Sequence, residues 1–276
     1  MRKPVKRVAV VHDLCGVGKA ALTNIIPVLS IMGVEVCPIP TMLLSTHTGG
    51  FGNPSIVKLP NYIDECDEHY SKYEIDFDAL LIGYLGSDSA IDSAIKFIWR
   101  NKSSNIVIDP IFGDHGKCYS NFDMIYVQGL KRLIAFADII TPNYTEACLL
   151  TGEDYIEDFS FSRIEKICNK LIDLGAKNIV ITSLPSKVEK DIGIAIYEKG
   201  ELSIISKEKK GEAYPGTGDI FTSVLIGERL RGKSLIESCE KAHNFVSECI
   251  EESSKFDYPR REGVLLEKKL YLLVNK

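Results

Sequence analysis

Short runs rich in valine, isoleucine and leucine alternate with segments of helical periodicity along most of this chain. This alternation constrains the fold more than any other feature, because strand–helix–strand units close with right-handed crossovers and set their strands in parallel. Strands are predicted at residues 5–11, 34–44, 77–85, 105–112, 138–143 and 177–184, and helices at 19–33, 60–73, 87–102, 122–137, 162–175 and 216–232. Residues 191–207 predict a hairpin that turns at 198–201. The sequence therefore predicts an α/β fold with a central, mostly parallel sheet and helices on both faces.

The chain shows no internal repeat, low-complexity segment or linker, which predicts one domain over residues 1–276. A net charge of −5 without a long run of one sign disfavours nucleic acid and anionic membranes as partners. No apolar stretch approaches the ~20 residues that a membrane span requires. The eight cysteines are scattered and form no C-x-x-C pair, so we expect reduced, mostly structural thiols and a cytoplasmic protein.

The segment CGVGKA, residues 15–20, follows the first predicted strand and carries part of a phosphate-binding P-loop pattern. A full P-loop needs Gly five positions before Gly18 and a Ser or Thr directly after Lys19. Asp13 and Ala20 occupy these two positions, and Asp13 would place a negative charge where phosphate lies. We therefore interpret the segment as a tight turn between the first strand and the first helix, and look for phosphate binding elsewhere.

Polar residues follow two predicted strands at the point where each strand ends. Asp109 ends a buried run with Asp114 soon after it, and Thr141, Asn143 and Glu146 follow the next strand. Ligands of open parallel sheets bind outside the carboxyl ends of the strands, and Mg²⁺ favours a few carboxylates plus substrate phosphates. Asp-Pro and Gly-Asp also form turns, and Glu146 could instead complement a helix N-terminus, so both interpretations stay open at this point.

The segment PGTGD, residues 215–219, precedes an apolar helical run. Its glycines would let phosphate approach unpaired N–H groups at the positive end of the helix, which makes an anion site. Phosphate would repel Asp219 beside this site unless the carboxylate had a task. One such task is to accept the proton of a hydroxyl that attacks the terminal phosphoryl group of a nucleotide. A plain helix N-cap is the alternative interpretation, since Asp favours that position.

Taken together, four segments resemble those of pyridoxal kinases, which belong to the ribokinase-like superfamily. They are PTMLLSTHTGGFG (40–52), DPIFGDHG (109–116), ITPNYTEACLLTG (140–152) and GTGDIF (216–221), and they occur in the same order. The resemblance runs from about residue 8 to about residue 247. GTGD alone indicates the superfamily, whereas TPN-x-x-E together with DP-x-x-GD points to pyridoxal or pyridoxamine kinases. The resemblance implies a ribokinase-like fold and ATP-dependent phosphorylation of the 5′-hydroxymethyl group of pyridoxal, pyridoxine or pyridoxamine.

The resemblance also implies roles for residues in these segments. Asp219 matches the catalytic base, beside an anion hole formed by Gly216, Thr217 and Gly218. The residues that match nucleotide contacts are Asn143, Thr182, Ser183 and Asp114, and those that match the magnesium region are Asp109 and Glu146. Residues 111–121 match a flap over the site. ATP and Mg²⁺ are thus expected, a requirement for a monovalent cation such as K⁺ stays open, and a homodimer is expected because family members commonly form one.

On the substrate side, the resemblance places Tyr84, Ser45 and His47 near the pyridine ring. The chain departs from the family where many members have Ser-His in the first strand-to-helix turn, because here the segment reads His12-Asp13-Leu14. Asp13 is therefore expected to contact the substrate, and the CGVGKA turn to shape the vitamer site. A carboxylate near the ring would favour the cationic amine of pyridoxamine, a hypothesis that rests on one charge.

Three alternatives stay open on these residues. Hydroxymethylpyrimidine kinases share the fold but usually carry Cys in place of Asp219 and a GGAG segment in the first turn. Sugar kinases of the ribokinase type usually carry GAGD and an added lid of strands. A nucleotide- or vitamin-binding protein without catalysis would be free to lose Asp219, Asn143 and Glu146, all of which this chain retains.

Overall fold

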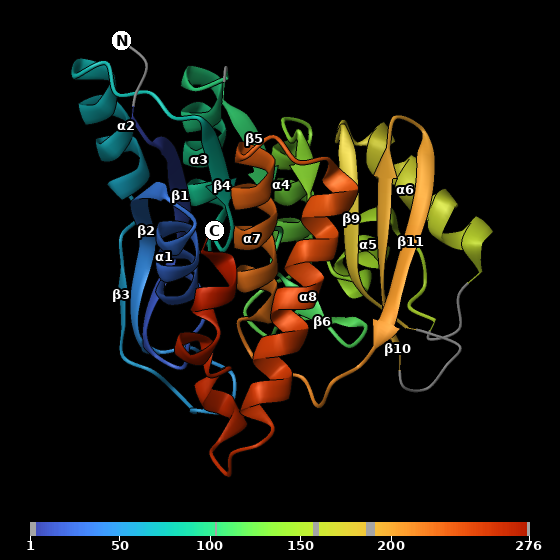
Figure 1. Cartoon of the computed structure of the whole chain (residues 1–276). Helices are drawn as coiled ribbons and strands as arrows, with labels where there is room; N and C mark the ends of the chain where they lie inside the picture. Colours follow the sequence, from blue (N-terminus) through green and yellow to red (C-terminus); the bar gives the residue numbers. More distant parts are fainter. Residues whose placement is uncertain (1–3, 103, 157–159, 186–190, 275–276) are drawn as a thin grey trace.

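The computed structural model describes residues 4–102, 104–156, 160–185 and 191–274, and these form a central sheet in the order β11-β10-β9-β8-β5-β4-β1-β2-β3 (Figure 1). The strands are β1 (Lys6–Val17), β2 (Val34–Thr46), β3 (Ile56–Lys58), β4 (Ala79–Ile82), β5 (Asn105–Ile108), β8 (Ile139–Ile140), β9 (Asn178–Pro185), β10 (Asp191–Glu198) and β11 (Glu201–Glu208). The pairs from β2 to β9 across the centre are parallel. At the edges β3, β10 and β11 pair antiparallel. The predicted α/β class with a mostly parallel sheet is confirmed.

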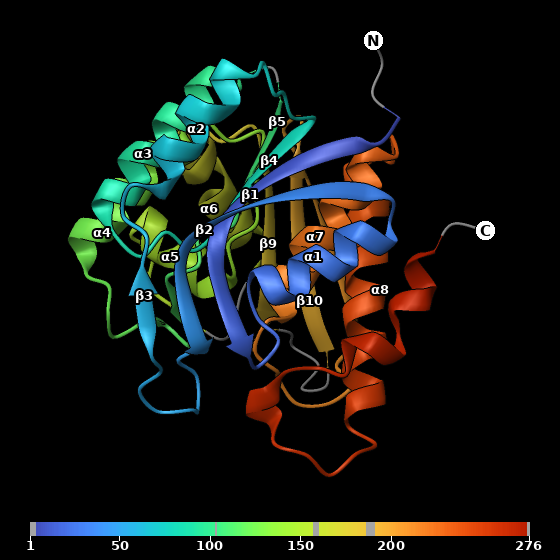
Figure 2. The ribbon, with the colours of Figure 1, turned by 90° about the vertical axis from the view of Figure 1, so that its left-hand side faces the viewer.

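Helices cover both faces of this sheet (Figure 2). One face carries α1 (Leu22–Ile31), α7 (Thr217–Leu230) and α8 (Leu235–Ser253), and the other carries α2 (Tyr62–Lys72), α3 (Asp88–Arg100), α4 (Met124–Ile134), α5 (Tyr144–Thr151) and α6 (Phe161–Asp173). Each face has its own core because successive strand residues point to opposite sides. Within β1, Val8 and Val10 pack on the α1 and α7 side, while Ala9 and Val11 pack on the side of α2 to α6.

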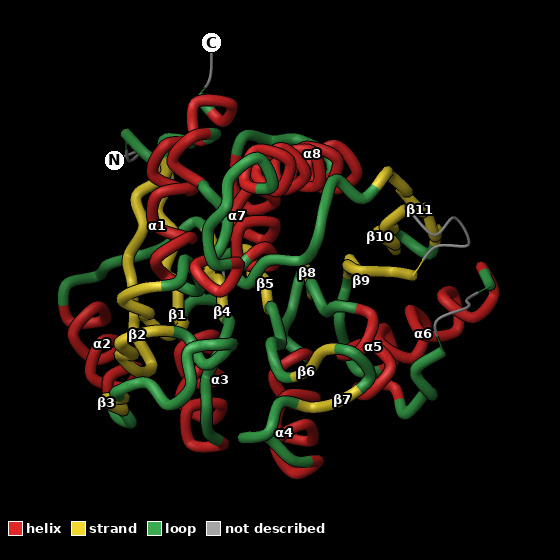
Figure 3. Tube along the Cα trace, turned by 90° about the horizontal axis from the view of Figure 1, so that it is seen from below, coloured by secondary structure: helices red, strands yellow, loops and turns green. Residues whose placement is uncertain are grey.

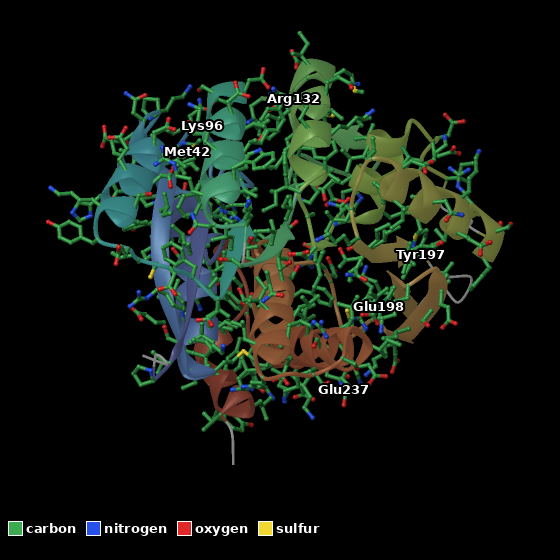
Figure 4. The ribbon with its side chains drawn as sticks, turned by 90° about the horizontal axis from the view of Figure 1, so that it is seen from above. Met42, Lys96, Arg132, Tyr197, Glu198 and Glu237 are labelled. Carbon is green, nitrogen blue, oxygen red and sulfur yellow. The ribbon has the colours of Figure 1, made fainter. Side chains whose placement is uncertain are left out.

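The β10–β11 hairpin shows the same alternation at one edge of the sheet. It turns at Lys199 and Gly200, whose φ angles are 55° and 84°, within the predicted turn. Figure 4 shows Tyr197 and Glu198 on opposite faces of β10. The Tyr197 hydroxyl donates a hydrogen bond to Asn169 Oδ1 of α6 at 2.7 Å, whereas Glu198 lies on the side of α8. The hairpin therefore contacts both helical layers.

The carboxyl ends of the parallel strands meet at one edge, which Figure 3 shows from below. A small hairpin of β6 (Gly113–Asp114) and β7 (Lys117–Cys118) lies at this edge beside α5. It falls within residues 111–121, the segment predicted as a flap. The first turn of α7 reaches the same edge, so the predicted site segments converge there.

The predicted tight turn at residues 15–20 is placed differently in the structure. The pairing of β1 with β2 continues past a register shift between His12 and Leu14 and ends at Val17, so residues 15–17 belong to the strand. The turn itself occupies residues 18–21. The long partner strand β2 supplies hydrogen bonds beyond the irregularity, which periodicity in β1 alone does not reveal.

Two helices, α5 and α8, were not predicted from apolar periodicity. Each begins with a capping box, in which the N-cap side chain and a Glu three residues later bond each other's backbone N–H: Asn143 with Glu146, and Ser234 with Glu237. Short 3₁₀ helices at Arg260–Glu262, Leu266–Lys268 and Leu270–Leu273 follow α8. Among the helices of the described ranges, none combines the length and apolar character needed to cross a membrane.

Candidate active site

The N-terminal end of α7 faces open space at the carboxyl edge of the sheet. Its N-cap Gly216 has φ 76°, a conformation that favours glycine, and no described side chain caps this end of the helix. A Cβ at Gly216 would lie 2.2 Å from the carbonyl oxygen of Lys19, so the close packing also requires glycine. A Cβ at Gly218 would meet no described atom within 4 Å. Uncapped N–H groups beside open space suit an anion such as phosphate.

Asp219 lies in the first turn of α7 and is 8% exposed. Its Oδ2 accepts a hydrogen bond of 2.6 Å from the N–H of Ala21. The loop that brings Ala21 there has positive φ at Gly18 (110°), Lys19 (45°) and Ala21 (59°). Residues with a Cβ adopt such angles at an energetic cost. The fold therefore holds the CGVGKA loop in a strained shape that aims one N–H at the predicted base.

Asn24 of α1 joins this loop to α7, and sequence reasoning missed it. The side chain is fully buried, and its Nδ2 donates to the carbonyl oxygens of Lys19 and Gly216, the latter at 3.1 Å. The isolated Asn on an apolar helix face was the available signal, because a buried amide needs partners. The contact fixes the first loop against the predicted anion hole.

Sequence reasoning also missed His12, which lies between two carboxylates. Its Nδ1 is 2.7 Å from Asp13 Oδ1, and its Nε2 is 3.2 Å from Asp219 Oδ1. Burial lowers the pKa of His12, but the hydrogen bond to Asp13 and the attraction of the Asp13 and Asp219 charges outweigh burial and raise this pKa to about 10. Burial raises the pKa of Asp13, but the hydrogen bond and charge of His12 outweigh it and leave this pKa lowered. The thiol of Cys15 donates to Asp13 Oδ2 at 3.1 Å, so Asp13, the predicted substrate contact, is already paired.

Asp109 and Glu146 form a buried acidic pair at the same edge. Asp109 directly follows β5, and its Oδ2 accepts a 3.0 Å hydrogen bond from the hydroxyl of Thr222 on α7. Burial is the main cause that raises the pKa of Asp109, and the negative charge of Asp219 raises it further. Burial also raises the pKa of Glu146, and the negative charge of Asp109 adds to this increase. A divalent cation would relieve both effects. The buried carboxylate pair fits Mg²⁺, which needs few carboxylates when phosphates and water complete its shell. Among the described residues, no group of three or more potential ligands is present.

Glu146 also holds the flap. Its Oε1 accepts hydrogen bonds from the N–H groups of Phe112 (2.9 Å) and Gly113 (3.3 Å), and its Oε2 accepts one from Asn143 (2.9 Å). The side chain of Asn143 donates to the carbonyl oxygen of Gly113 at 2.8 Å. Both interpretations of Glu146 therefore retain support: it complements a helix N-terminus and it lies beside Asp109. Its metal role stays a prediction.

The predicted flap is linked to the predicted vitamer side through Tyr84. The side chain of Asn121 donates to the Tyr84 hydroxyl at 2.7 Å, and the Tyr84 ring lies 5.4 Å from that of Phe122. Phe122 in turn stacks on Tyr126 of α4 at 4.0 Å.

Asp114 on β6 is exposed and accepts a 2.8 Å hydrogen bond from the N–H of His115. The predicted nucleotide contact Asp114 and the predicted ring contact Tyr84 are thus joined by one short segment.

Ser45 at the end of β2 and His47 directly after this strand are both bonded to other parts of the protein. His47 Nε2 lies 2.6 Å from the carbonyl oxygen of Arg261, and its Nδ1 accepts a 3.0 Å hydrogen bond from the N–H of Gly49. The ring also packs against Gly18, where a Cβ would lie 2.3 Å from it. Ser45 Oγ accepts a 3.0 Å hydrogen bond from the N–H of Ser55. These contacts give both residues a structural task, and their contact with substrate stays a prediction.

Thr182 and Ser183 lie near the carboxyl end of β9. The N–H of Thr182 donates to the carbonyl oxygen of Pro142 at 2.9 Å, and Thr182 forms a parallel bridge with Asn143. Ser183 is exposed and has φ 57°. The bridge brings three of the predicted nucleotide residues to one place.

Positioning and charge stabilisation are most of what a protein contributes to phosphoryl transfer. The open end of α7, the held carboxylate of Asp219 and the acidic pair offer both at one edge, as in kinases of the ribokinase-like fold. Residues 32–262 match the family model described as phosphomethylpyrimidine kinase, and the chain belongs to this family.

The similarity extends over most of the chain. It is 29% identical to the pyridoxal kinase of Dictyostelium discoideum over 244 residues, which are 80% of this chain and 78% of that protein. A candidate phosphomethylpyrimidine kinase of Bacteroides thetaiotaomicron, in a crystal form with pyridoxal, is 38% identical with a TM-score of 0.92 and coverage of 98% and 96%. The pyridoxal kinase of Lactobacillus plantarum is 33% identical, with a TM-score of 0.90 and coverage of 97% and 96%. These proteins confirm the ribokinase-like fold expected from the sequence.

Proposed function

We propose that the protein is an ATP-dependent kinase that phosphorylates the 5′-hydroxymethyl group of a B6 vitamer in vitamin B6 salvage. The observation that carries this proposal is Asp219, a carboxylate held from two sides at the open N-terminal end of α7. The Bacteroides protein with pyridoxal supports a B6 vitamer as the acceptor, since it is similar over nearly the whole chain.

In the proposed reaction, ATP lies across the carboxyl edge with its terminal phosphates at the N–H groups of Thr217 and Gly218. Asp219 accepts the proton of the substrate hydroxyl while the hydroxyl oxygen bonds to the γ-phosphorus and ADP leaves. The helix end stabilises the charge on the transferring group. Asp109, directly or through water, and Glu146 through its charge would hold Mg²⁺, which supplies neutralisation of phosphate charge.

The remaining predicted contacts follow from this arrangement. Nucleotide contacts are proposed for Asn143, Thr182, Ser183 and Asp114, and vitamer contacts for Asp13, Ser45, His47 and Tyr84. Residues 111–121 would close over the site and exclude water, which limits hydrolysis of ATP. The contact with His12 partly neutralises the negative charge of Asp13. We therefore expect a weaker preference for pyridoxamine than a free carboxylate would give.

The second candidate is phosphorylation of hydroxymethylpyrimidine in thiamin synthesis. The family model that matches this chain is described as phosphomethylpyrimidine kinase, and one relative is named a hydroxymethylpyrimidine/phosphomethylpyrimidine kinase, which favours this candidate. Asp219 occupies the position where such kinases usually have Cys, which favours a B6 vitamer. The two substrates share a hydroxymethyl group on a flat heterocycle, so the phosphoryl-transfer geometry alone does not separate them.

The test is an ADP-release assay with Mg-ATP and pyridoxal, pyridoxamine, pyridoxine or hydroxymethylpyrimidine, each alone. We expect kcat/KM to be highest for one of the three B6 vitamers. A higher kcat/KM for hydroxymethylpyrimidine would move the enzyme to thiamin synthesis. Tight binding of ADP and vitamer without turnover would instead identify a non-catalytic binding protein.

We also propose that the chain is a single domain that acts in the cytoplasm as a homodimer. The eight cysteines, all within the described ranges, form no disulfide, as expected for a reducing compartment. Exposed apolar side chains gather on the edge formed by β2 and β3, where Leu43, Ile56 and Val57 are 38%, 46% and 55% exposed. An exposed apolar edge strand is a ready site for pairing with a second copy. Sedimentation of the wild type and of Val57→Lys checks this, because the charge should shift the protein towards monomer.

A further inference from the structure

The imidazole of His12 lies against Asp219, the proposed base, but takes no direct part in the proposed proton transfer. We propose that His12 is a positioning residue that holds the carboxylate of Asp219 for proton abstraction, and that Asp13 anchors its imidazole ring. The inference rests on the proposed kinase function, because it gives Asp219 the task of a base. Asp13 thus has the task of holding the His12 ring, in addition to its proposed contact with the substrate.

The fold brings His12 to Asp219 through strand alternation and one glycine. Val8 and Val10 of β1 face the α7 side, and His12 follows them at the same spacing of two. The imidazole fills the space over Gly83, directly after the neighbouring strand β4, where a Cβ would lie 2.1 Å from the ring. The ring is 3% exposed. Its orientation is therefore set by packing, and it points at the first turn of α7.

The distances assign protons to both ring nitrogens. Nδ1 of His12 and Oδ1 of Asp13 lie 2.7 Å apart, and two lone pairs at this distance would repel each other without a proton between the two atoms. Nδ1–H therefore donates to Asp13 Oδ1. The N–H of Asp13 also lies 2.9 Å from Nδ1, and this second contact is secondary because Nδ1 then has no free lone pair for it. A bare lone pair on Nε2 would repel the carboxylate 3.2 Å away, so Nε2 also carries a proton. The pKa of about 10 for His12 agrees with this assignment.

The charges around the ring support an imidazolium. Asp13 contacts the ring from β1 and also accepts a hydrogen bond from the thiol of Cys15. Asp219 faces the ring from α7, and Asp109 after β5 lies close enough to interact with its charge. An imidazolium between Asp13 and Asp219 compensates one of these negative charges. Because both nitrogens are already protonated, His12 does not take the proton of the substrate. That proton passes from the hydroxyl oxygen to Asp219.

The two oxygens of Asp219 are held from different directions. Oδ2 accepts a hydrogen bond from Ala21, while Oδ1 faces His12 Nε2 at an ion-pair distance without a well-aligned hydrogen bond. A carboxylate held at both oxygens cannot rotate freely, and this keeps a lone pair towards the open helix end. Misplacement of a catalytic group by about 1 Å reduces rates by about 100-fold, which is the effect that the loss of His12 should approach.

Two substitutions separate the two ring nitrogens. His12→Asn places an amide near Nδ1, so it keeps a contact with Asp13 and is too short to reach Asp219. His12→Gln places an amide near Nε2, so it keeps the contact with Asp219. The matched control is His69→Asn, which changes an exposed histidine on α2.

We expect His12→Asn to lower kcat by about 100-fold, with KM for ATP and vitamer within about threefold of the wild type. His12→Gln should recover at least about tenfold of that loss, and His69→Asn should leave kcat unchanged. A kcat within threefold of the wild type for His12→Asn would overturn the proposal. So would equal losses in the Asn and Gln variants at unchanged melting temperature.

The ring charge is measured independently of activity by ¹⁵N NMR of the unliganded wild type, with the His12 signals assigned by their loss in His12→Asn. We expect both nitrogens at imidazolium shifts from pH 6 to 9. A neutral imidazole in this range would overturn the proposal even if the variants fail to fold, in which case assignment comes from backbone correlations. A wild type inactive on all four compounds would refute the proposed function, while the NMR result would still decide the charge of His12.

Discussion

At the scale of single residues, the site depends on groups that are held rather than free. Asp219 is fixed by Ala21 and His12, Asp109 by Thr222, and Glu146 by three backbone N–H groups. Preorganised groups of this kind act on the transition state without reorganising during the reaction. Substitutions that keep shape and change one function should therefore be the most informative.

Asp219→Asn keeps the shape of the side chain and removes its ability to accept a proton. We expect kcat to fall by about 10²- to 10⁴-fold, the usual contribution of a general base, while ADP binds within a few-fold of its normal affinity. Steady-state kinetics and calorimetric titration with ADP measure the two quantities. Asp92→Asn, which alters an exposed ion pair with Arg132, is the control and should change neither. Near-normal turnover of Asp219→Asn would remove Asp219 from the role of base.

Gly216→Ala tests the close packing under the anion hole. Gly216 and Gly33 have nearly the same φ, 76° and 82°, but a Cβ at Gly33 would meet no described atom within 4 Å. Gly33→Ala should therefore lose about 1–2 kcal/mol from the left-handed conformation alone. Gly216→Ala should lose more, because its Cβ would displace Lys19 and Asn24, and its kcat should collapse as α7 shifts. Urea unfolding and kinetics compare the pair, and equal effects in both variants would contradict the packing argument.

At the scale of elements, the flap is attached at both of its ends. Glu146 and Asn143 bind its start near Gly113, and Asn121 binds Tyr84 near its end. The β6–β7 hairpin begins at the first attachment, and its turn is held as well, because the N–H of Gly116 donates to Thr145 Oγ1 at 3.0 Å. The short hairpin is thus a stiff unit whose position relative to the site depends on a few side-chain hydrogen bonds.

Asn121→Ala and Tyr84→Phe remove the same hydrogen bond from opposite sides. Each should raise KM for the vitamer several-fold and increase ATP hydrolysis without vitamer, because a looser flap admits water. The double variant should be no worse than the more damaging single variant, since the two residues share one interaction. Strictly additive losses would show that Asn121 and Tyr84 act separately. Ser89→Ala, at an exposed site in α3, is the control.

At the scale of the whole molecule, several buried groups hold protons more firmly when the chain is folded. The pKa of His12 is raised to about 10, and those of Asp109 and Glu146 are raised by burial and neighbouring negative charge. Above the pKa values of the unfolded chain, the folded state therefore binds more protons. Stability falls with rising pH wherever this holds. His12 thus stabilises fully below about pH 6.5 and loses its contribution as pH rises towards 10.

We therefore expect the melting temperature of the unliganded protein to fall between pH 6.5 and pH 8. Groups with shifts in the opposite sense act below this window. Among them are Glu153, whose pKa is lowered to about 2 chiefly by hydrogen bonds from Lys170 and Lys166, and His243, whose pKa is lowered to about 4 chiefly by burial. Calorimetry across the window tests the sign, and a flat or rising melting temperature would contradict it. His12→Gln should flatten the dependence, because it removes one of the titrating groups.

Local patterns in the chain were sufficient to predict the alternation of strands and helices, the class of sheet and the segments that meet at its carboxyl edge. The strand runs, the hairpin turn at Lys199 and Gly200 and the glycines around Thr217 are short-range signals, because they depend on side-chain periodicity and backbone conformation within a few residues. The helices α5 and α8 carried such a signal in their capping boxes, although apolar periodicity did not reveal them.

Contacts between distant residues decided the rest. Asn24 meets Gly216 across 192 positions, and His12 meets Asp219 because α7 packs on the face of the sheet to which alternate residues of β1 point. No local pattern encodes such a pair, since each partner alone is an ordinary polar residue. The sequence by itself therefore determined which segments could bind phosphate and supply a base. Only tertiary packing decided how the base is held, because its charge and orientation depend on side chains that the folded sheet brings within hydrogen-bond distance.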